Sequence, residues 1–306
     1  MKRSDIGVVL VTFNRIEMLK KSLVCYEAQT VKPAYIIVVD NCSTDGTVEY
    51  LKEWEKKDLP FEAEVIYLPE NTGGSGGFYA GLEKAQAKPE ASWIWVADDD
   101  GFPEQDCFEK AEKFIREHDA ELPSISAFCG MCVDGGRPAP VQRARFVKKF
   151  FMRQELPVPE KEFSSGTPFT IDLYSFVGTI LKKSALLEAG LPRKDFFIYQ
   201  DDYEHAVRMG KVGKIYCVPE IVIEHKDNYT KNRGASWRDY YATRNIVILY
   251  KEHLDKLSLY GRIARRLLIA YSSFNRTKIR LIKDAISDGM NGRTGIHKIY
   301  KPGWNA

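Results

Sequence analysis

Strand and helix signals alternate along residues 1–130, and this alternation constrains the fold more than any other feature of the chain. Short apolar runs rich in β-branched residues predict strands at residues 6–13, 36–39, 65–68 and 93–97. Longer stretches between and after these runs predict helices at residues 17–29, 47–57, 77–87 and 104–118. Strands that alternate with helices of this length form βαβ units. The chain therefore predicts an α/β fold with a mainly parallel, Rossmann-like sheet flanked by helices.

The rest of the chain is less regular. Residues 133–165 are rich in proline and charged residues, which predicts an irregular excursion, and strand and helix signals return from residue 175. Residues 236–286 predict two or three helices. With 306 residues and 44% hydrophobic content, the chain is long enough for one large domain and an appendage. We expect a main domain at residues 1–235 and a helical C-terminal region at residues 236–306.

Composition narrows the environment and the partners. The net charge of +3 is too small to indicate nucleic-acid binding. Six scattered cysteines include one CxxC pair, Cys129 and Cys132, without the second pair or the histidine that a zinc site needs. The N-terminus has no apolar run of the signal-peptide type, and no run of 18 apolar residues exists. These features predict a cytoplasmic protein, peripheral at most to the inner face of the membrane.

Polar clusters follow each of the four predicted strands. They are Thr12 with Arg15, Asp40 with Asn41, residues 71–77, and Asp98 to Asp100. In parallel sheets, ligands bind outside the carboxyl ends of the strands. Four such clusters at four strand ends predict one binding site along this edge.

The acidic triplet Asp98, Asp99 and Asp100 is the strongest chemical signal. Three adjacent carboxylates at the end of a buried strand repel one another and lose hydration, and a divalent cation relieves both costs. Two of them with a diphosphate would fill much of the coordination shell of Mn²⁺ or Mg²⁺. The alternative is a solvated turn that leads into the next helix. His225, which follows a short predicted strand, could complete the metal shell, although a lone histidine is more often structural.

Three further segments each carry two interpretations. Asp40 could accept hydrogen bonds from a nucleotide base or ribose, or it could only shape the turn. The glycine-rich residues 71–77, with Asn71, Gly73 and Gly74, could admit a ligand close to the backbone, or form a plain flexible connection. Asp202 follows the aromatic residues 196–199, and such surroundings raise the pKa of a carboxyl group and suit a general base. Asp202 could equally charge the first turn of a helix.

Together these pieces resemble the family 2 glycosyltransferases, which have the GT-A fold. The resemblance spans roughly residues 6–250 and rests on residues 11–15, 39–41, 98–100 and 201–202 and on His225. It implies that Thr12, Arg15 and Asp40 hold the nucleotide, with Asp99 near the ribose or donor sugar. It implies that Asp98, Asp100 and His225 bind the metal. Asp202 would then be the base that deprotonates the acceptor for inverting transfer.

Two segments indicate subgroups of this family. Residues 71–78 are similar to the glycine-rich loop of galactofuranosyltransferases, which implies UDP-galactofuranose as donor. Tyr240, Tyr241, Arg244 and Asn245 resemble a later motif of rhamnosyltransferases, which implies dTDP-rhamnose as the alternative. The chain is much shorter than the polymerising galactofuranosyltransferases, which favours a single transfer.

The C-terminal region predicts a partner surface. Residues 262–283 hold seven basic side chains and no acidic one, mixed with leucine and isoleucine. Such a helix can lie on an anionic membrane, which would suit a lipid-linked acceptor, or it can pack on the domain or on a second subunit of a homo-oligomer. The acceptor itself could be a glycan or a lipid-linked molecule.

Two rival functions remain at this point. A nucleotide-sugar-binding protein without catalysis would not need all of Asp98, Asp100, Asp202 and His225. A nucleotidyltransferase usually needs a basic, phosphate-gripping loop near its N-terminus, where only Arg15 is well placed.

Overall fold

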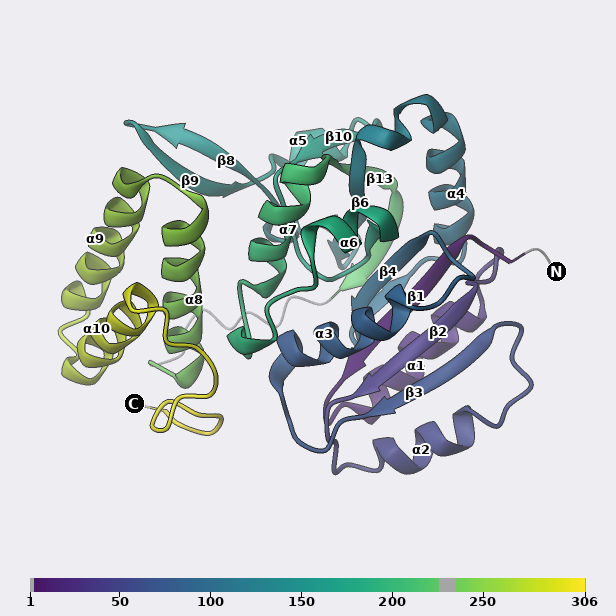
Figure 1. Cartoon of the computed structure of the whole chain (residues 1–306), viewed down its shortest axis with the longest axis horizontal. Coiled ribbons are helices and arrows are strands. Elements are labelled where there is room, and N and C mark those ends of the chain that lie inside the picture. Colours follow the sequence, from purple (N-terminus) through teal and green to yellow (C-terminus); the bar gives the residue numbers. More distant parts are fainter. Residues whose placement is uncertain (1–2, 226–234, 306) are drawn as a thin grey trace.

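The computed structural model describes residues 3–225 and 235–305. A large mixed sheet runs through its centre in the strand order β10-β13-β6-β12-β4-β1-β2-β3. Four strands of one half are parallel and adjacent: β1 (Ile6–Thr12), β2 (Tyr35–Asp40), β3 (Glu62–Tyr67) and β4 (Trp93–Asp98). This half confirms the predicted βαβ units, because a helix joins each of these strands to the next one along the chain (Figure 1).

The other half of the sheet is built around one antiparallel strand. β12 (Thr179–Lys182) runs antiparallel to β4 and to β6 (Ile125–Asp134), and β13 (Lys214–His225) pairs parallel with β6. Short strands extend this half: β5 (Gly101–Pro103) and β10 (Phe169–Ile171) pair with β13, and β7 (Arg137–Pro138) pairs with β6. The short strand predicted before His225 is therefore part of a longer strand with a bulge, and His225 is its last residue.

Helices cover both faces of the sheet because the side chains of each strand alternate between them. On one face, Val8 and Leu10 pack in a cluster with α1 (Ile16–Glu27), α2 (Thr47–Trp54) and α4 (Cys107–Glu117). On the other face, Val9 and Val11 pack with α3 (Gly73–Gln86), α6 (Lys183–Ala189) and α7 (Asp201–Val212). The continuous apolar runs of β1, β2 and β4 reflect this burial on two sides.

The predicted irregular excursion contains regular structure. β8 (Arg143–Lys149) and β9 (Met152–Pro157) form an antiparallel hairpin that projects from the main sheet, and β11 (Leu173–Tyr174) adds to β8 (Figure 1). A short helix, α5 (Glu160–Phe163), and the turn η2 (Pro140–Gln142) complete this part of the chain. Two further turns lie outside it, η1 (Asp119–Ser124) before β6 and η3 (Lys194–Phe196) after α6. The hairpin has no apolar alternation to reveal it, because charged residues are frequent in both strands and most side chains are at least partly exposed.

Three helices follow: α8 (Trp237–His253), α9 (Lys256–Ser272) and α10 (Arg276–Met290). Local signals set where they begin. Ser236 and Asp239 form a capping box at α8, and the side chains of Asp255 and Asn275 accept hydrogen bonds from the first turns of α9 and α10. Among the described residues, no helix has the length and apolar character needed to cross a bilayer.

Candidate active site

The carboxyl ends of β1, β2 and β4 bring distant polar residues together. Thr12 lies opposite Asp40 in the ladder of β1 and β2, and Val11 lies opposite Asp98 in the ladder of β1 and β4. The backbone N–H of Asp99 donates to the carbonyl oxygen of Val11 at 3.2 Å. Residues that are 28 and 86 positions from Thr12 therefore share one edge, as the alternation of strands and helices predicts.

Asp99 links the first and fourth strands through its side chain. The hydroxyl of Thr12 donates to Oδ2 of Asp99 at 2.7 Å, and Nη1 of Arg15 donates to Oδ1 at 3.2 Å. The same guanidinium pairs with Oδ2 of Asp100 at 2.5 Å. Burial raises the pKa of Asp99 to about 6, although Arg15 and Thr12 act to lower it. Arg15 is thus an ion-pair partner of the acids in this structure, with half of its side chain exposed.

Asp98, Asp100 and His225 have the chemistry of a divalent cation site. Burial, reinforced by the two neighbouring carboxylates, raises the pKa of Asp98. Burial also acts to raise the pKa of Asp100, but the interactions with His225 and Arg15 outweigh it and hold that pKa below its ordinary value. His225 reaches Asp100 because β13 pairs with β5, and its Nε2 lies 3.4 Å from Oδ1 of Asp100. Its other ring nitrogen, Nδ1, is buried and has no hydrogen-bond partner within residues 3–225 and 235–305. An imidazole nitrogen next to Asp100, beside carboxylates that repel one another, provides the type of donors that a divalent cation prefers.

The glycine-rich segment differs from its prediction. Residues 71–77 were expected to form a flexible loop, yet α3 begins at Gly73. Gly73 has a φ of +73°, and a Cβ at this position would lie 1.9 Å from the carbonyl oxygen of Phe197, so the close approach needs glycine. Gly74, by contrast, faces open space. A tertiary contact with Phe197 therefore fixes the backbone at this point. Of these two glycines, only Gly73 is required by that contact.

Asn41 holds this segment against the strand end. Its amide nitrogen donates to Oδ1 of Asn71 at 3.2 Å and to the carbonyl oxygen of Gly73 at 2.9 Å. Its side-chain oxygen accepts hydrogen bonds from the backbone N–H and the hydroxyl of Thr72 at 2.9 and 3.0 Å. Asn71 in turn accepts from the backbone N–H of Gly73 at 2.8 Å. Asn41 stood among the motif residues in the sequence, but its positioning role could not be inferred there because its partners lie 30 positions away.

A backbone contact of Asp40 supports the interpretation that this residue shapes a turn. The side chain is almost fully buried, and both carboxylate oxygens lie within 3.3 Å of the backbone N–H of Ser43, which donates to them. Asp40 therefore shapes the turn after β2. A contact with a nucleotide base or ribose stays a prediction.

The segment before Asp202 has unusual backbone geometry. Phe197, Tyr199 and Gln200 all have φ values near +67°, a region that non-glycine residues rarely adopt. Asn245 in α8 stabilises it: its amide nitrogen donates to the carbonyl oxygens of Phe196, Ile198 and Tyr199 at 2.9–3.0 Å. Arg244 also donates to the Phe196 oxygen, at 3.0 Å. Arg244 and Asn245, two of the four residues that resemble a rhamnosyltransferase motif, thus stabilise the loop that leads into α7.

Asp201 and Asp202 open α7, so both the helix-start and the acid–base interpretations of Asp202 fit its position. Burial, and then repulsion from Asp201, raise the pKa of Asp202 to about 8. Burial also raises the pKa of Asp201 to about 6. A carboxyl group with so high a pKa holds an acquired proton at neutral pH, which is the property of an effective base toward a hydroxyl group.

A second cluster of ligand-type side chains is a salt-bridge network. Atoms of Glu204, Glu252 and His253 lie within 4.8 Å of one another. Each already has a partner: Glu204 with Arg208 at 2.8 Å, Glu252 with Arg193 at 2.8 Å, and His253 with Lys211 at 3.1 Å. The network joins α7 to α8, and a cation there would have to displace positive side chains.

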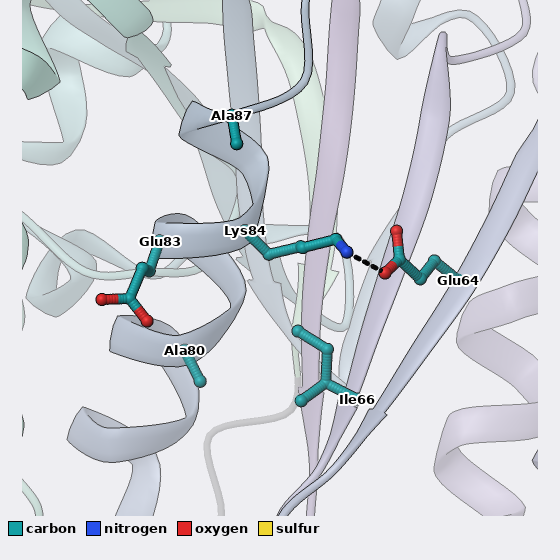
Figure 2. A pocket seen from close by; sticks show the side chains of 6 residues that line it. All are labelled: Glu64, Ile66, Ala80, Glu83, Lys84 and Ala87. Atoms are coloured by element: carbon teal, nitrogen blue, oxygen red, sulfur yellow. Dashed lines mark ion pairs between the residues drawn. The ribbon is translucent and has the colours of Figure 1, made fainter.

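A separate hollow lies on the same face as α3. Figure 2 shows a shallow pocket of about 420 Å³ between β3 and the C-terminal half of α3, lined by Glu64, Ile66, Ala80, Glu83, Lys84 and Ala87. Lys84 crosses it to pair with Glu64 at 2.6 Å. The edge formed by the strand ends meets the opposite, N-terminal end of α3, where Asn41 bonds to Gly73, so this pocket is separate from the acidic residues.

Comparisons with known sequences agree with this geometry. Residues 7–184, more than half of the chain, match the family model of Glycosyl transferase family 2. Galactofuranosyltransferase GlfT1 of Mycobacterium tuberculosis (strain ATCC 25618 / H37Rv) is 31% identical over 211 residues, which cover 68% of this chain and 66% of that relative. The chain thus spans just under two thirds of the relative. The putative teichuronic acid biosynthesis glycosyltransferase TuaG of Bacillus subtilis (strain 168) is 28% identical over 130 residues, 42% of this chain and 49% of that protein.

Solved structures show the same fold at low identity. GalNAc-T7 with UDP, GalNAc and Mn²⁺ matches 94% of this chain and 56% of its own, with a TM-score of 0.65 and 15% identity. S. aureus TarS 1-349 in complex with UDP-GlcNAc matches 95% of this chain and 81% of its own, with a TM-score of 0.60 and 16% identity. The predicted GT-A fold is therefore confirmed, and the chain belongs to the family 2 glycosyltransferases.

Proposed function

We propose that this glycosyltransferase moves galactofuranose from UDP-galactofuranose to a hydroxyl group of a glycan or lipid-linked acceptor, in a single transfer that inverts the anomeric configuration. The observation that carries the proposal is the meeting of Thr12, Arg15, Asp99 and Asp100 with His225 at one edge of the sheet. The likeness to galactofuranosyltransferase GlfT1 supports the choice of donor.

In this proposal Asp98, Asp100 and His225 hold Mn²⁺ or Mg²⁺, which would supply positive charge for the diphosphate of the donor. The GalNAc-T7 structure with Mn²⁺ and UDP shares the fold and supports such a cofactor. Arg15, which is half exposed, is placed to turn from the acids toward the diphosphate. Asp40, Asn71, Gly73 and Gly74 would line the nucleotide, and Asp99 would face the ribose or the sugar.

Asp202 carries the proton transfer in the proposed mechanism. Its carboxylate accepts the proton of the acceptor hydroxyl as that oxygen bonds to the anomeric carbon. The bond between this carbon and the diphosphate oxygen breaks on the opposite side, and UDP leaves with the electron pair. One such displacement inverts the configuration. The strained loop before α7 orients Asp202, because Asn245 fixes three of its carbonyl groups.

A donor panel tests the proposal. The purified chain is incubated with UDP-galactofuranose, dTDP-rhamnose or UDP-GlcNAc, with acceptor and with Mn²⁺, Mg²⁺ or chelator. We expect release of UDP from UDP-galactofuranose and a product of inverted anomeric configuration by NMR. Turnover of dTDP-rhamnose alone would move the assignment to a rhamnosyltransferase. Release of pyrophosphate would indicate nucleotidyl transfer, and donor binding without turnover would indicate a binding protein.

A further inference from the structure

The outward side of α9 is apolar although it is exposed. Ser258, Leu259 and Ala270 face inward and are buried. Leu257, Tyr260, Leu268 and Tyr271 stand at i, i+3, i+11 and i+14, which is one side of a helix, and between 48% and 71% of each is exposed. An apolar stripe of this kind normally packs against a partner.

The tip of the β8–β9 hairpin is also apolar and exposed. Phe150 and Phe151 form its turn, with φ values of +47° and +67°, and are 89% and 77% exposed. The hairpin is attached to α9: the backbone N–H of Arg153 donates to the hydroxyl of Ser258 at 2.7 Å, and Glu155 of β9 pairs with Arg262. In Figure 1 the tip lies above the N-terminal end of α9, at the end of the molecule far from β3.

The charge of this surface is positive. Lys148 and Lys149 precede the two phenylalanines, and Arg265 lies on the exposed part of α9. None of these three has a carboxylate partner within residues 3–225 and 235–305. The nearby acids are already engaged, since Glu155 pairs with Arg262 and the side chain of Asp255 accepts from Ser258 at the start of α9.

We propose that the hairpin tip and the outward side of α9 form one binding surface for an anionic lipid bilayer. Aromatic and aliphatic side chains would enter the interface between headgroups and acyl chains, and the lysines and arginines would pair with anionic headgroups. A second copy of the chain fits less well, because a symmetric contact would place this positively charged surface against the same positively charged surface of the other copy. This inference goes beyond sugar transfer and does not depend on the identity of the donor.

Vesicle flotation of the full chain tests the proposal. We expect binding to vesicles of phosphatidylcholine mixed with phosphatidylglycerol, weak binding to phosphatidylcholine alone, and loss of binding at high salt. Lys148→Gln with Lys149→Gln should weaken binding about 25-fold, because each basic residue near an anionic surface contributes about fivefold. Phe150→Ser with Phe151→Ser should weaken it at least about tenfold. Leu187→Ser is the matched control, because Leu187 is an exposed apolar residue of α6 outside the surface.

The outcomes separate the explanations. All four substituted side chains of the hairpin are exposed, so each variant should melt at the temperature of the wild type. If a hairpin variant melts at a lower temperature, Leu268→Ser in α9 takes its place in the binding assay. Equal vesicle binding by the wild type and the hairpin variants would overturn the proposal. So would a wild type that ignores vesicles but is dimeric by light scattering while the phenylalanine variant is monomeric. Because the assay needs no turnover, failure of the donor assignment would not affect it.

Discussion

Asp202→Asn tests the proposed base through activity and stability together. Asparagine has the shape of a protonated aspartic acid, so the backbone N–H of Tyr203 can still donate to Oδ1. The variant cannot accept a proton, and loss of a general base lowers turnover by about 10²- to 10⁴-fold. Donor affinity should be nearly unchanged, because in the proposed mechanism Asp202 contacts the acceptor hydroxyl and not the nucleotide.

The expected stability change follows from the pKa. The folded protein holds the pKa of Asp202 near 8, against 3.8 for an ordinary aspartic acid. A raised pKa favours the protonated folded form, so the wild type loses stability as the pH rises from about 4 to about 8. At about 1.4 kcal/mol per pKa unit the loss is at most about 6 kcal/mol, and because Asp201 is coupled to the shift we expect about 2 kcal/mol. Asp202→Asn should therefore melt about 4 °C above the wild type at pH 8, with the gain vanishing near pH 4.

The assay pairs calorimetry with the pH profile of kcat/KM. In the wild type, kcat/KM should rise about tenfold per pH unit and level off near pH 8, because only the ionised Asp202 can act. Glu204→Gln is the matched control in the same helix. His253 and Arg208 overcome the effect of burial and lower the pKa of Glu204 to about 2, a contribution that is present above pH 4.5 and lost as the pH falls toward 2. This control should lose about 3 kcal/mol at pH 8. A less stable Asp202→Asn, or one with a wild-type pH profile, would refute the reasoning.

Three further predictions follow from the site. Gly73→Ala should lower the melting temperature and turnover together, since its Cβ collides with the Phe197 carbonyl; a melting curve like that of the wild type would contradict the contact. Asn245→Ala should lower kcat about 10- to 100-fold with KM for the donor little changed, because it positions Asp202 and not the nucleotide; an effect on KM alone would exclude this role. Asp100→Asn should weaken Mn²⁺ binding measured by calorimetry, and chelator should abolish turnover of the wild type; full activity in chelator would remove the metal from the mechanism.

The sheet half of the molecule was predictable from the sequence because its signals are local. Apolar runs marked β1, β2 and β4, and the parallel arrangement then placed Thr12, Asp40 and Asp98 on one edge. These residues can be grouped without knowledge of the loop structures. Their individual roles depend on the loops, so the sequence left both interpretations of Asp40 open. The contact with Ser43 supports the interpretation that Asp40 shapes the turn.

Features made by long-range contacts were not predictable. The start of α3 at Gly73 depends on the carbonyl of Phe197, more than a hundred residues later. The role of Asn245 depends on carbonyl groups 46–49 residues earlier. The β8–β9 hairpin was not predicted, because an exposed two-stranded ribbon lacks the apolar alternation that burial of one face imposes. In each case the sequence contained the residue, but its partner was set only by the fold.

The helix α8 therefore belongs to the proposed site and not only to a C-terminal appendage. Asn245 and Arg244 bond to backbone carbonyls of the loop before Asp202, and His253 pairs with Glu204 in the same helix as Asp202. Bonds to carbonyl groups do not depend on the side chains of the loop, so those side chains can vary without loss of its geometry. The strand ends, by contrast, hold their acids through side-chain contacts such as that of Thr12 with Asp99. Substitutions at the strand ends should thus change donor binding, whereas substitutions in the loop and α8 should change acceptor activation.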